Sequence, residues 1–167
     1  MATRWLFSLF FPVGRMDIRL LEQAFDAAEA YAGFQAAHGA LGAVASFTGV
    51  VRAQASDAAV GYLYLDWYPG MTEASIHAIA DATVERFGVA ALAIWHRCGR
   101  VDAGQPVVFV AAASPHRRAA FEAVDYAMDR LKSEAAFWKR EVGPGLDRWI
   151  EPTQGDRKDL ERWTTKP

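Results

Sequence analysis

Cysteine is almost absent from this sequence, and its scarcity excludes two classes of small protein. The single cysteine, Cys98, can form neither an intramolecular disulfide nor a cysteine-rich metal site, and we expect it to be a small core residue. A reducing compartment, the cytoplasm, fits this composition. The histidines do not show the HxH or HExxH spacing of metal ligands; they are His38, His77, His96 and His116. We therefore predict no metal and no cofactor.

A net positive charge is lacking as well. Lysine and arginine together number 18, against 20 aspartate and glutamate residues, and the formal net charge is -2. Without a basic field over the whole chain, neither nucleic acid nor an acidic membrane surface is a favoured partner. An anion would have to be bound by a local cluster of cations.

Long hydrophobic runs and nucleotide-binding motifs are also missing. The first 15 residues, MATRWLFSLFFPVGR, contain an apolar run that is too short to span a bilayer. No small-residue cleavage site follows it, so we interpret residues 1–15 as an extension outside the domain, either a mis-called start or a tag. An export signal is the less favoured alternative. Neither a Walker loop nor a GxGxxG fingerprint occurs.

What the chain does contain is an ordinary globular composition, 52% hydrophobic and 23% charged over 167 residues, which fits one domain. Residue periodicity predicts helices over 17–37 (chiefly its second half), 72–87 and 114–134. It predicts strands over 43–52, 60–68, 89–97, 106–113 and 137–142, with a last edge at 148–150. The strand over 106–113 is apolar enough to be buried on both faces. We expect a single α+β domain over 16–150 and a polar, loosely held tail over 151–167.

The segment Ser114-Pro115-His116-Arg117 follows a strand and opens a helix, with Ser114 as the N-cap and Pro115 at the first helical position. Free backbone N–H groups and the helix dipole favour an anion there. Cations at a helix start are electrostatically unfavourable, so the placement of His116 and Arg117 there requires an explanation. Binding of an anionic ligand would explain it. The alternative is a solvated first turn.

Two lysines are candidates for chemistry. Lys139 stands in the run Phe137-Trp138-Lys139-Arg140, where apolar and cationic neighbours depress the pKa of a lysine by desolvation and like-charge repulsion. Such a lysine can act as a nucleophile or as an acid. Whether Lys132 meets Lys139 depends on the tertiary fold, and two ordinary surface lysines are an equal alternative.

Two further features carry open interpretations. Arg52 ends a strand beside a loop of small residues, and it is a functional candidate only if the fold brings it toward Arg117. The strand over 60–68 is rich in aromatic residues that alternate between its faces; they are Tyr62, Tyr64, Trp67 and Tyr68. One face belongs to the core, and the other could be an apolar surface for a protein partner.

Seven segments, in order along the chain, resemble one known family. They are SFTGVVR (46–52), WYPGM (67–71), HRCG (96–99), SPHRRAAFEA (114–123), the D-x-x-K run (129–132), FWKRE (137–141) and DRW (147–149). Together they extend over most of the chain and are similar to the large, catalytic subunit of molybdopterin synthase.

The resemblance implies an α/β-hammerhead-like fold with an additional antiparallel sheet, and a homodimer. Each end of that dimer would bind a small ubiquitin-like sulfur-carrier subunit, giving a heterotetramer, and the carrier's C-terminal Gly-Gly thiocarboxylate would enter the active site. This sulfurtransferase adds two sulfurs to cyclic pyranopterin monophosphate, which yields molybdopterin in molybdenum cofactor biosynthesis, with no metal in the enzyme. By position, the active-site lysines would be Lys132 and Lys139, and the anion-binding residues would be Arg52, His116 and Arg117, with Arg148 a further candidate.

The chain departs from the family pattern near several of these motifs, which affects local substrate contacts more than the proposed catalytic groups; the positions are Ala53, Gln54, Asp66, Trp67, Gln105 and Ala136. A competing interpretation is a non-catalytic module that binds an anion or a partner through the same basic pocket and tolerates the loss of Lys139. Single-stranded nucleic-acid binding by the aromatic strand is disfavoured by the acidic balance.

Overall fold

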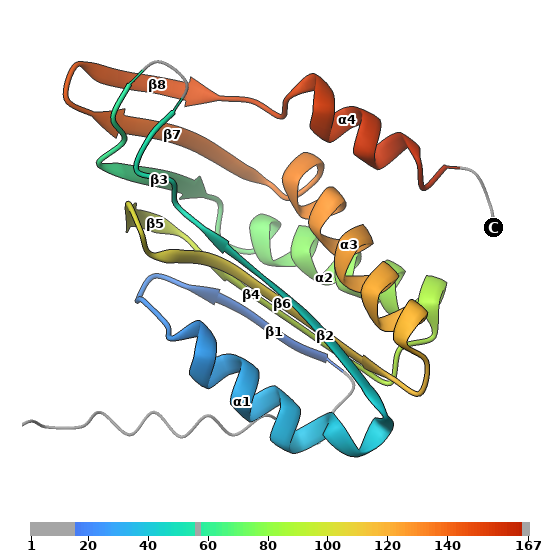
Figure 1. Ribbon diagram of the computed structural model, residues 1–167. Helices are drawn as coiled ribbons and strands as arrows, with labels where there is room; N and C mark the ends of the chain where they lie inside the picture. Colours follow the sequence, from blue (N-terminus) through green and yellow to red (C-terminus); the bar gives the residue numbers. More distant parts are fainter. Residues whose placement is uncertain (1–15, 56–57, 165–167) are drawn as a thin grey trace, which may run out of the picture.

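Two four-stranded sheets and four α-helices make up residues 16–55 and 58–164, the part of the chain that the computed structural model describes (Figure 1). The elements are β1 Met16–Leu21, α1 Ala27–His38, the short 3-10 helix η1 Gly39–Leu41, β2 Ala43–Val50, β3 Tyr62–Trp67, α2 Met71–Phe87, β4 Ala91–Arg97, β5 Gly99–Asp102, β6 Pro106–Ser114, α3 Arg117–Ser133, β7 Phe137–Gly143, β8 Leu146–Ile150 and α4 Gln154–Glu161. The predicted α+β class is confirmed, whereas the extension predicted over 1–15 lies outside the described residues.

The first sheet has the strand order β1-β4-β6-β2, with β1 parallel to β4 and the other pairs antiparallel. Helices cover both of its faces, α2 and α3 on one side and α1 on the other (Figure 1). Along β4, Leu92 and Ile94 face α2 and α3, while Ala93 and Trp95 face α1. Residues 108–114 of β6 are all buried, which confirms the prediction of a strand covered on both sides.

The second sheet has the order β5-β3-β7-β8 and is antiparallel throughout, which confirms the additional antiparallel sheet. The chain crosses from the first sheet to the second between β4 and β5, where Gly99 has a φ of 68° that suits glycine. A small core joins this sheet to the flanking loops and contains Val51, Val60, Leu65, Val101 and Leu146.

The helix predicted over 17–37 is wrong in its first half, where the chain forms strand β1. Apolar Ile18 and Leu20 face the core beneath α2 and α3, while Asp17 pairs with Arg19 at 2.8 Å and accepts a hydrogen bond from the indole N–H of Trp95. Pairing with the open edge of β4 therefore outweighs the local helix pattern. The short strand β5 was also absent from the sequence-based prediction.

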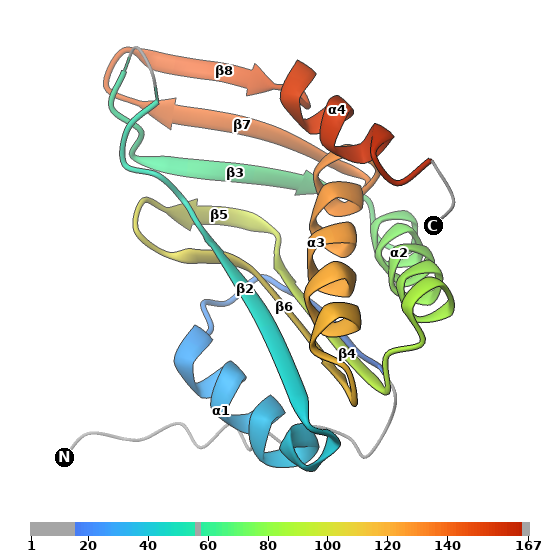
Figure 2. The ribbon, with the colours of Figure 1, turned by 45° about the vertical axis from the view of Figure 1, so that its right-hand side comes forward.

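The predictions for the start of α3 and for the tail also need correction. The helix begins at Arg117 with His116 as a cap that makes no side-chain capping bond, and Ser114 Oγ instead accepts a hydrogen bond from the His116 N–H at 3.2 Å. The described part of the tail, residues 151–164, is not loosely held, because residues 154–161 form α4, which packs beside the end of α3 (Figure 2). Both features matter for the placement of the cations.

Candidate active site

The two lysines singled out from the sequence lie together where α3 ends and β7 begins. Lys132 is in the last turn of α3, and Lys139 lies on β7. Their side chains line the same two cavities together with Arg52, which follows β2. The fold therefore resolves the question that spacing left open: the lysines are neighbours, and Arg52 lies with them rather than with Arg117.

The lysines lie at the border of two cavities that differ in character. The first has a volume of about 500 Å³ and a mainly apolar lining, which includes Phe47, Leu63, Leu65, Val108 and Leu131. The second has a volume of about 520 Å³, and many of its lining side chains are charged or polar, among them Glu141, Arg148, Thr153 and Asp156. Two reactants of different chemistry could therefore reach the same pair of ammonium groups from different sides.

Lys139 has an environment that favours loss of its proton. Its strand register places it beside Leu65 of β3 and Ile150 of β8, so its stem is held against apolar side chains. Burial is the main cause that lowers the pKa of Lys139; the carboxylate of Asp156 opposes this, and the ammonium of Lys132 adds to it. The depressed pKa predicted from the sequence is confirmed.

Two arginines add positive charge around the lysines. Arg148 on β8 donates to Glu141 on β7 at 3.0 Å, so part of its charge is already balanced. Arg52 is exposed, and among the described residues no carboxylate pairs with it. A guanidinium in that state is available to an incoming anion, which it can bind with two parallel hydrogen bonds.

A carboxylate that sequence reasoning missed completes the polar cavity. Asp156 Oδ1 accepts a hydrogen bond from Lys132 Nζ at 3.2 Å. Its other oxygen accepts the backbone N–H and the hydroxyl of Thr153 at 2.8 and 2.7 Å, which caps the start of α4. The pattern Thr-x-x-Asp is a variant of a helix-capping signal and could have revealed α4, but not its contact with Lys132.

His96 lies on the wall of the apolar cavity and stacks on Phe137, with ring centroids 4.3 Å apart. Its Nδ1–H donates to the Arg97 carbonyl at 2.7 Å, because a carbonyl can only accept. Burial lowers the pKa of His96 to about 4, although the bond to Arg97 acts the other way. The imidazole is therefore neutral at pH 7 and adds no further positive charge beside the lysines.

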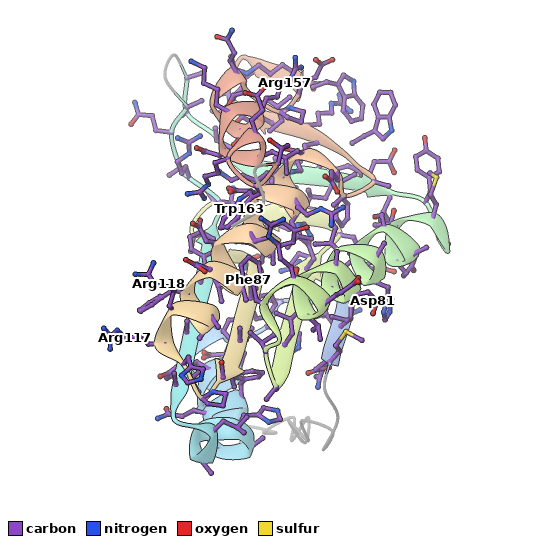
Figure 3. The ribbon with its side chains drawn as sticks, turned by 90° about the vertical axis from the view of Figure 1, so that its right-hand side faces the viewer. Asp81, Phe87, Arg117, Arg118, Arg157 and Trp163 are labelled. Carbon is purple, nitrogen blue, oxygen red and sulfur yellow. The ribbon has the colours of Figure 1, made fainter. Side chains whose placement is uncertain are left out.

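His116 and Arg117 lie at the other end of α3, where they line a separate cavity of about 720 Å³. Arg117 begins the helix and Lys132 lies in its last turn, so the rise of an α-helix puts them about 22 Å apart. Figure 3 shows Arg117 and Arg118 pointing away from the ribbon at this end. One chain therefore brings Arg52, Lys132, Lys139 and Arg148 together, but not His116 and Arg117.

The single cysteine takes no part in either cluster. Cys98 is buried at the junction of β4 and β5, and burial, helped by the nearby charge of Glu22, raises the pKa of its thiol to about 11. It is thus the core residue that the sequence predicts. In residues 16–55 and 58–164, no three side chains of His, Cys, Asp or Glu form a cluster that could hold a metal ion. No helix in the same part of the chain is long and apolar enough to cross a membrane.

An exposed aromatic surface covers the outer face of the second sheet, on the side away from Lys139. Tyr64 of β3 lies there with Trp138 of β7 and Trp149 of β8, and the two tryptophans are 60% and 53% exposed. Their rings meet edge to face, with centroids 6.1 Å apart. The aromatic face predicted from β3 is therefore present and wider than that strand alone, and its use by a partner stays a prediction.

Comparisons with known proteins agree with this fold. The molybdopterin synthase catalytic subunit of Caulobacter vibrioides is 47% identical over 148 residues, which cover 89% of this chain and 97% of that protein. The molybdopterin biosynthesis MoaE protein from Burkholderia ambifaria MC40-6 superposes with a TM-score of 0.74 at 36% identity, over 90% of this chain and 99% of that one.

A more distant likeness shows the same fold. A chain of the protein-protein complex of subunit 1 and 2 of molybdopterin-converting factor from Helicobacter pylori 26695 is 21% identical with a TM-score of 0.67, over 80% of this chain and 89% of that one. The MoaE protein family itself matches residues 20–134, from β1 to the end of α3. On these matches, the chain belongs to the MoaE protein family, together with proteins named molybdopterin synthase catalytic subunit.

Proposed function

We propose that this chain is the catalytic subunit of a molybdopterin synthase, a sulfurtransferase that converts cyclic pyranopterin monophosphate to molybdopterin. The observation that carries the proposal is the meeting of Lys132 and Lys139 at the border of an apolar and a polar cavity, with Arg52 beside them. The family to which the chain belongs supports the same activity. The cytoplasmic location stays a prediction from the scarcity of cysteine.

The sulfur donor would be the C-terminal thiocarboxylate of a small ubiquitin-like carrier. The name of the Caulobacter relative, a catalytic subunit, supports a second subunit, and the buried thiol of Cys98 suits a reaction in which sulfur arrives on a partner. A glycine tail has no side chains, which suits the apolar cavity beside Lys139 that β2 and β3 border.

Each cation then has a separate task. Arg52, together with Arg148, would bind the phosphate of the pterin substrate by charge-assisted hydrogen bonds in the polar cavity. Lys139, whose pKa is lowered by burial, would donate or accept a proton on the pterin side chain as sulfur adds to it. Lys132 would hold the thiocarboxylate and stabilise the negative charge that develops during transfer.

A homodimer would explain the distant pair His116 and Arg117. A cation at the start of a helix opposes the helix dipole, and within one chain the length of α3 separates Arg117 from Lys132 by about 22 Å. In a two-fold dimer, however, the start of α3 in one chain can lie beside the lysines of the other. We propose that His116 and Arg117 bind the substrate's phosphate in the active site of the partner subunit, which completes a site shared between two chains.

Reconstitution tests the proposal directly. The purified protein is mixed with a thiocarboxylated carrier and cyclic pyranopterin monophosphate, and molybdopterin formation is measured for the wild type and Lys139→Ala. We expect product from the wild type and a fall of at least about 100-fold for Lys139→Ala, since removal of a general acid or base costs about 100-fold to 10,000-fold.

The matched control is Lys158→Ala, which removes an exposed lysine of α4 and should leave turnover unchanged. Binding of the carrier is measured for all three proteins, since Lys139→Ala should still bind it. Turnover retained by Lys139→Ala would rule out this lysine as the proton donor or acceptor. A folded wild type that binds the carrier but yields no product would instead support the non-catalytic binding module.

A further inference from the structure

The helix α4 is fastened to α3 at two separate points. At its start, Asp156 accepts a hydrogen bond from Lys132. Just beyond its end, Arg162 donates to Asp129 of α3 at 2.7 Å and pairs with Asp125 at 2.8 Å. The family match ends at residue 134, so this helix lies outside the matched segment, and none of the roles proposed above belongs to it.

An aromatic contact strengthens the second point. Trp163 donates its indole N–H to Asp129 at 2.7 Å, and its ring meets the rings of Phe87 and Tyr126 edge to face, with centroids 5.8 and 5.4 Å away. Figure 3 shows Trp163 close to Phe87 between α3 and α2. Asp129 lies about one helical turn before Lys132. The contacts of Asp129 therefore hold α4 next to Lys132, the residue that Asp156 of α4 contacts.

Asp156 is held in one orientation by its own helix. One carboxylate oxygen accepts the N–H and hydroxyl of Thr153, which leaves the other oxygen directed at Lys132. Its side chain is only 18% exposed. A carboxylate fixed in this way does not have to be ordered again when a ligand binds, which is the property expected of a group that positions another.

We propose that Asp156 is a positioning residue for the lysine pair: its carboxylate holds the Lys132 ammonium in place and balances the charge of the two lysines in the polar cavity. The effect on turnover rests on the proposed function, whereas the effect on the lysines themselves does not. The Asp and the Lys of the D-x-x-K run then both contact the C-terminal segment. Asp129 accepts the hydrogen bond from Arg162 that holds α4 in place, and Lys132 donates a hydrogen bond to Asp156.

The other charges around Lys139 cannot replace Asp156. The charged groups that line the cavities beside it, from every element packed there, are Arg52, Lys132, Glu141, Arg148, Glu151 and Asp156, with neutral His96 on the apolar side. Glu141 is already paired with Arg148, and Glu151 is exposed to solvent. Without Asp156, the two lysines and Arg52 would face one another with no carboxylate paired to any of them.

The test is Asp156→Asn in the full chain, because an asparagine side-chain oxygen can still accept the hydrogen bonds of Thr153 and cap α4. The matched control is Asp159→Asn, an exposed carboxylate on the same helix. In the reconstituted reaction we expect Asp156→Asn to lose about tenfold to 100-fold in turnover, and Asp159→Asn to stay at the wild-type rate. Asp156→Glu should recover part of the loss.

A second readout needs neither carrier nor substrate. The chain has only four lysines, Lys132, Lys139, Lys158 and Lys166, so protein labelled with ¹³C at the lysine ε-carbon gives few signals to titrate by NMR. Asp156 raises the pKa of Lys139 against the effect of burial, so Asp156→Asn should lower it further. The pH–rate limb that belongs to Lys139 should move to lower pH in the same direction.

The outcomes separate the two proposals. If the wild type yields no molybdopterin, the proposed function fails, and the lysine titration alone decides the role of Asp156. An unchanged Lys139 titration in Asp156→Asn would overturn the positioning role. So would turnover that rises in Asp156→Asn, because it would show that the carboxylate competes with the anionic substrate for the lysines.

Discussion

The two ends of α3 carry similar charges in opposite settings. At the C-terminal end, Lys132 lies where the helix dipole favours a cation, its ammonium is paired with Asp156, and Lys139 is half-buried beside it. At the N-terminal end, Arg117 is exposed beside His116, where the dipole disfavours a cation. Lys132 has its counter-charge within the chain, whereas among the described residues no carboxylate pairs with Arg117, and Glu122 pairs with the adjacent Arg118.

This difference shows which part of the site one chain can build by itself. Near the end of α3, the elements that follow it in the chain, β7, β8 and α4, lie beside it (Figure 2), and Arg52 joins them from the distant end of β2. Near its start, one cavity is bordered by the loop before β2, and another is bordered by the end of α2 and by Arg162 and Trp163 after α4. Glu122 on this side pairs with Arg118, whereas Arg117 has no such partner among the described residues, and a helix start of this kind suits an anionic ligand or a second copy of the chain.

The largest expected effect comes from mixing two inactive variants. Lys139→Ala removes a lysine near the C-terminal end of α3, and Arg117→Ala removes the arginine at its N-terminal end. Each variant homodimer alone should therefore have little turnover. If the site is shared across a two-fold dimer, co-expression should restore about a quarter of the wild-type activity, because half of the dimers are mixed and each has one intact site. Molybdopterin formation by the co-purified mixture measures this.

The opposite outcome of the mixing experiment is equally clear. If each chain uses its own Arg117 and Lys139, a mixed dimer contains no intact site and the mixture stays inactive. Mixing Lys139→Ala with Lys132→Ala is the matched control, because both lysines belong to one end of α3 and their mixture should recover nothing. Recovery in that control would show that the lysine end is itself divided between chains.

A moderate effect is expected when the half-buried charge of Lys139 is removed. Burial lowers the pKa of Lys139 from its usual 10.5, so the folded state holds its proton less well than the unfolded chain does. That ammonium costs stability at pH values below the folded-state pKa, and the cost fades as the pH rises toward 10.5. Lys139→Met should therefore raise the free energy of unfolding at neutral pH by about 1 kcal/mol.

Urea unfolding at neutral and at alkaline pH checks this, and the gain should shrink at the higher pH. Lys158→Met, at an exposed position of α4, should leave the free energy of unfolding unchanged at both. A Lys139→Met protein that is less stable than the wild type at neutral pH would mean that the attraction to Asp156 outweighs the burial of the ammonium.

Most of the fold could be predicted from local patterns, and the exceptions have physical causes. The long strands and α2 follow from their apolar periodicity, and β6 from its unbroken apolar run. The sequence predicts a helix where β1 forms, because the six residues of β1 give little periodicity. Hydrogen bonding to the edge of β4 is what stabilises the extended form. The four-residue strand β5 depends in the same way on its partner β3.

The sequence yields candidate residues for the site, whose roles stay predictions, but it does not yield the geometry of the site. Crowding by apolar neighbours pointed to Lys139, and the family resemblance pointed to the arginines. The helix predicted over 114–134 already separates Arg117 from Lys132, but local patterns could not show that Arg52 and Lys139 lie at the Lys132 end, because those contacts are made by other elements. Asp156 was missed because its role depends on the docking of α4 through Arg162 and Asp129, which is a long-range contact.

The smallest expected effect separates specific anion binding from a diffuse positive patch at the start of α3. Arg118 is adjacent to Arg117, its side chain is 85% exposed, and its one recorded ion pair is with Glu122 at 3.4 Å. Because such exposed pairs contribute little, Arg118→Ala should change the free energy of unfolding by less than about 0.5 kcal/mol and leave turnover at the wild-type rate. Urea unfolding and the reconstituted assay, run beside Arg117→Ala, measure both quantities. Similar losses of turnover in the two variants would mean that this end attracts the substrate by its overall charge, and that Arg117 has no individual contact with it.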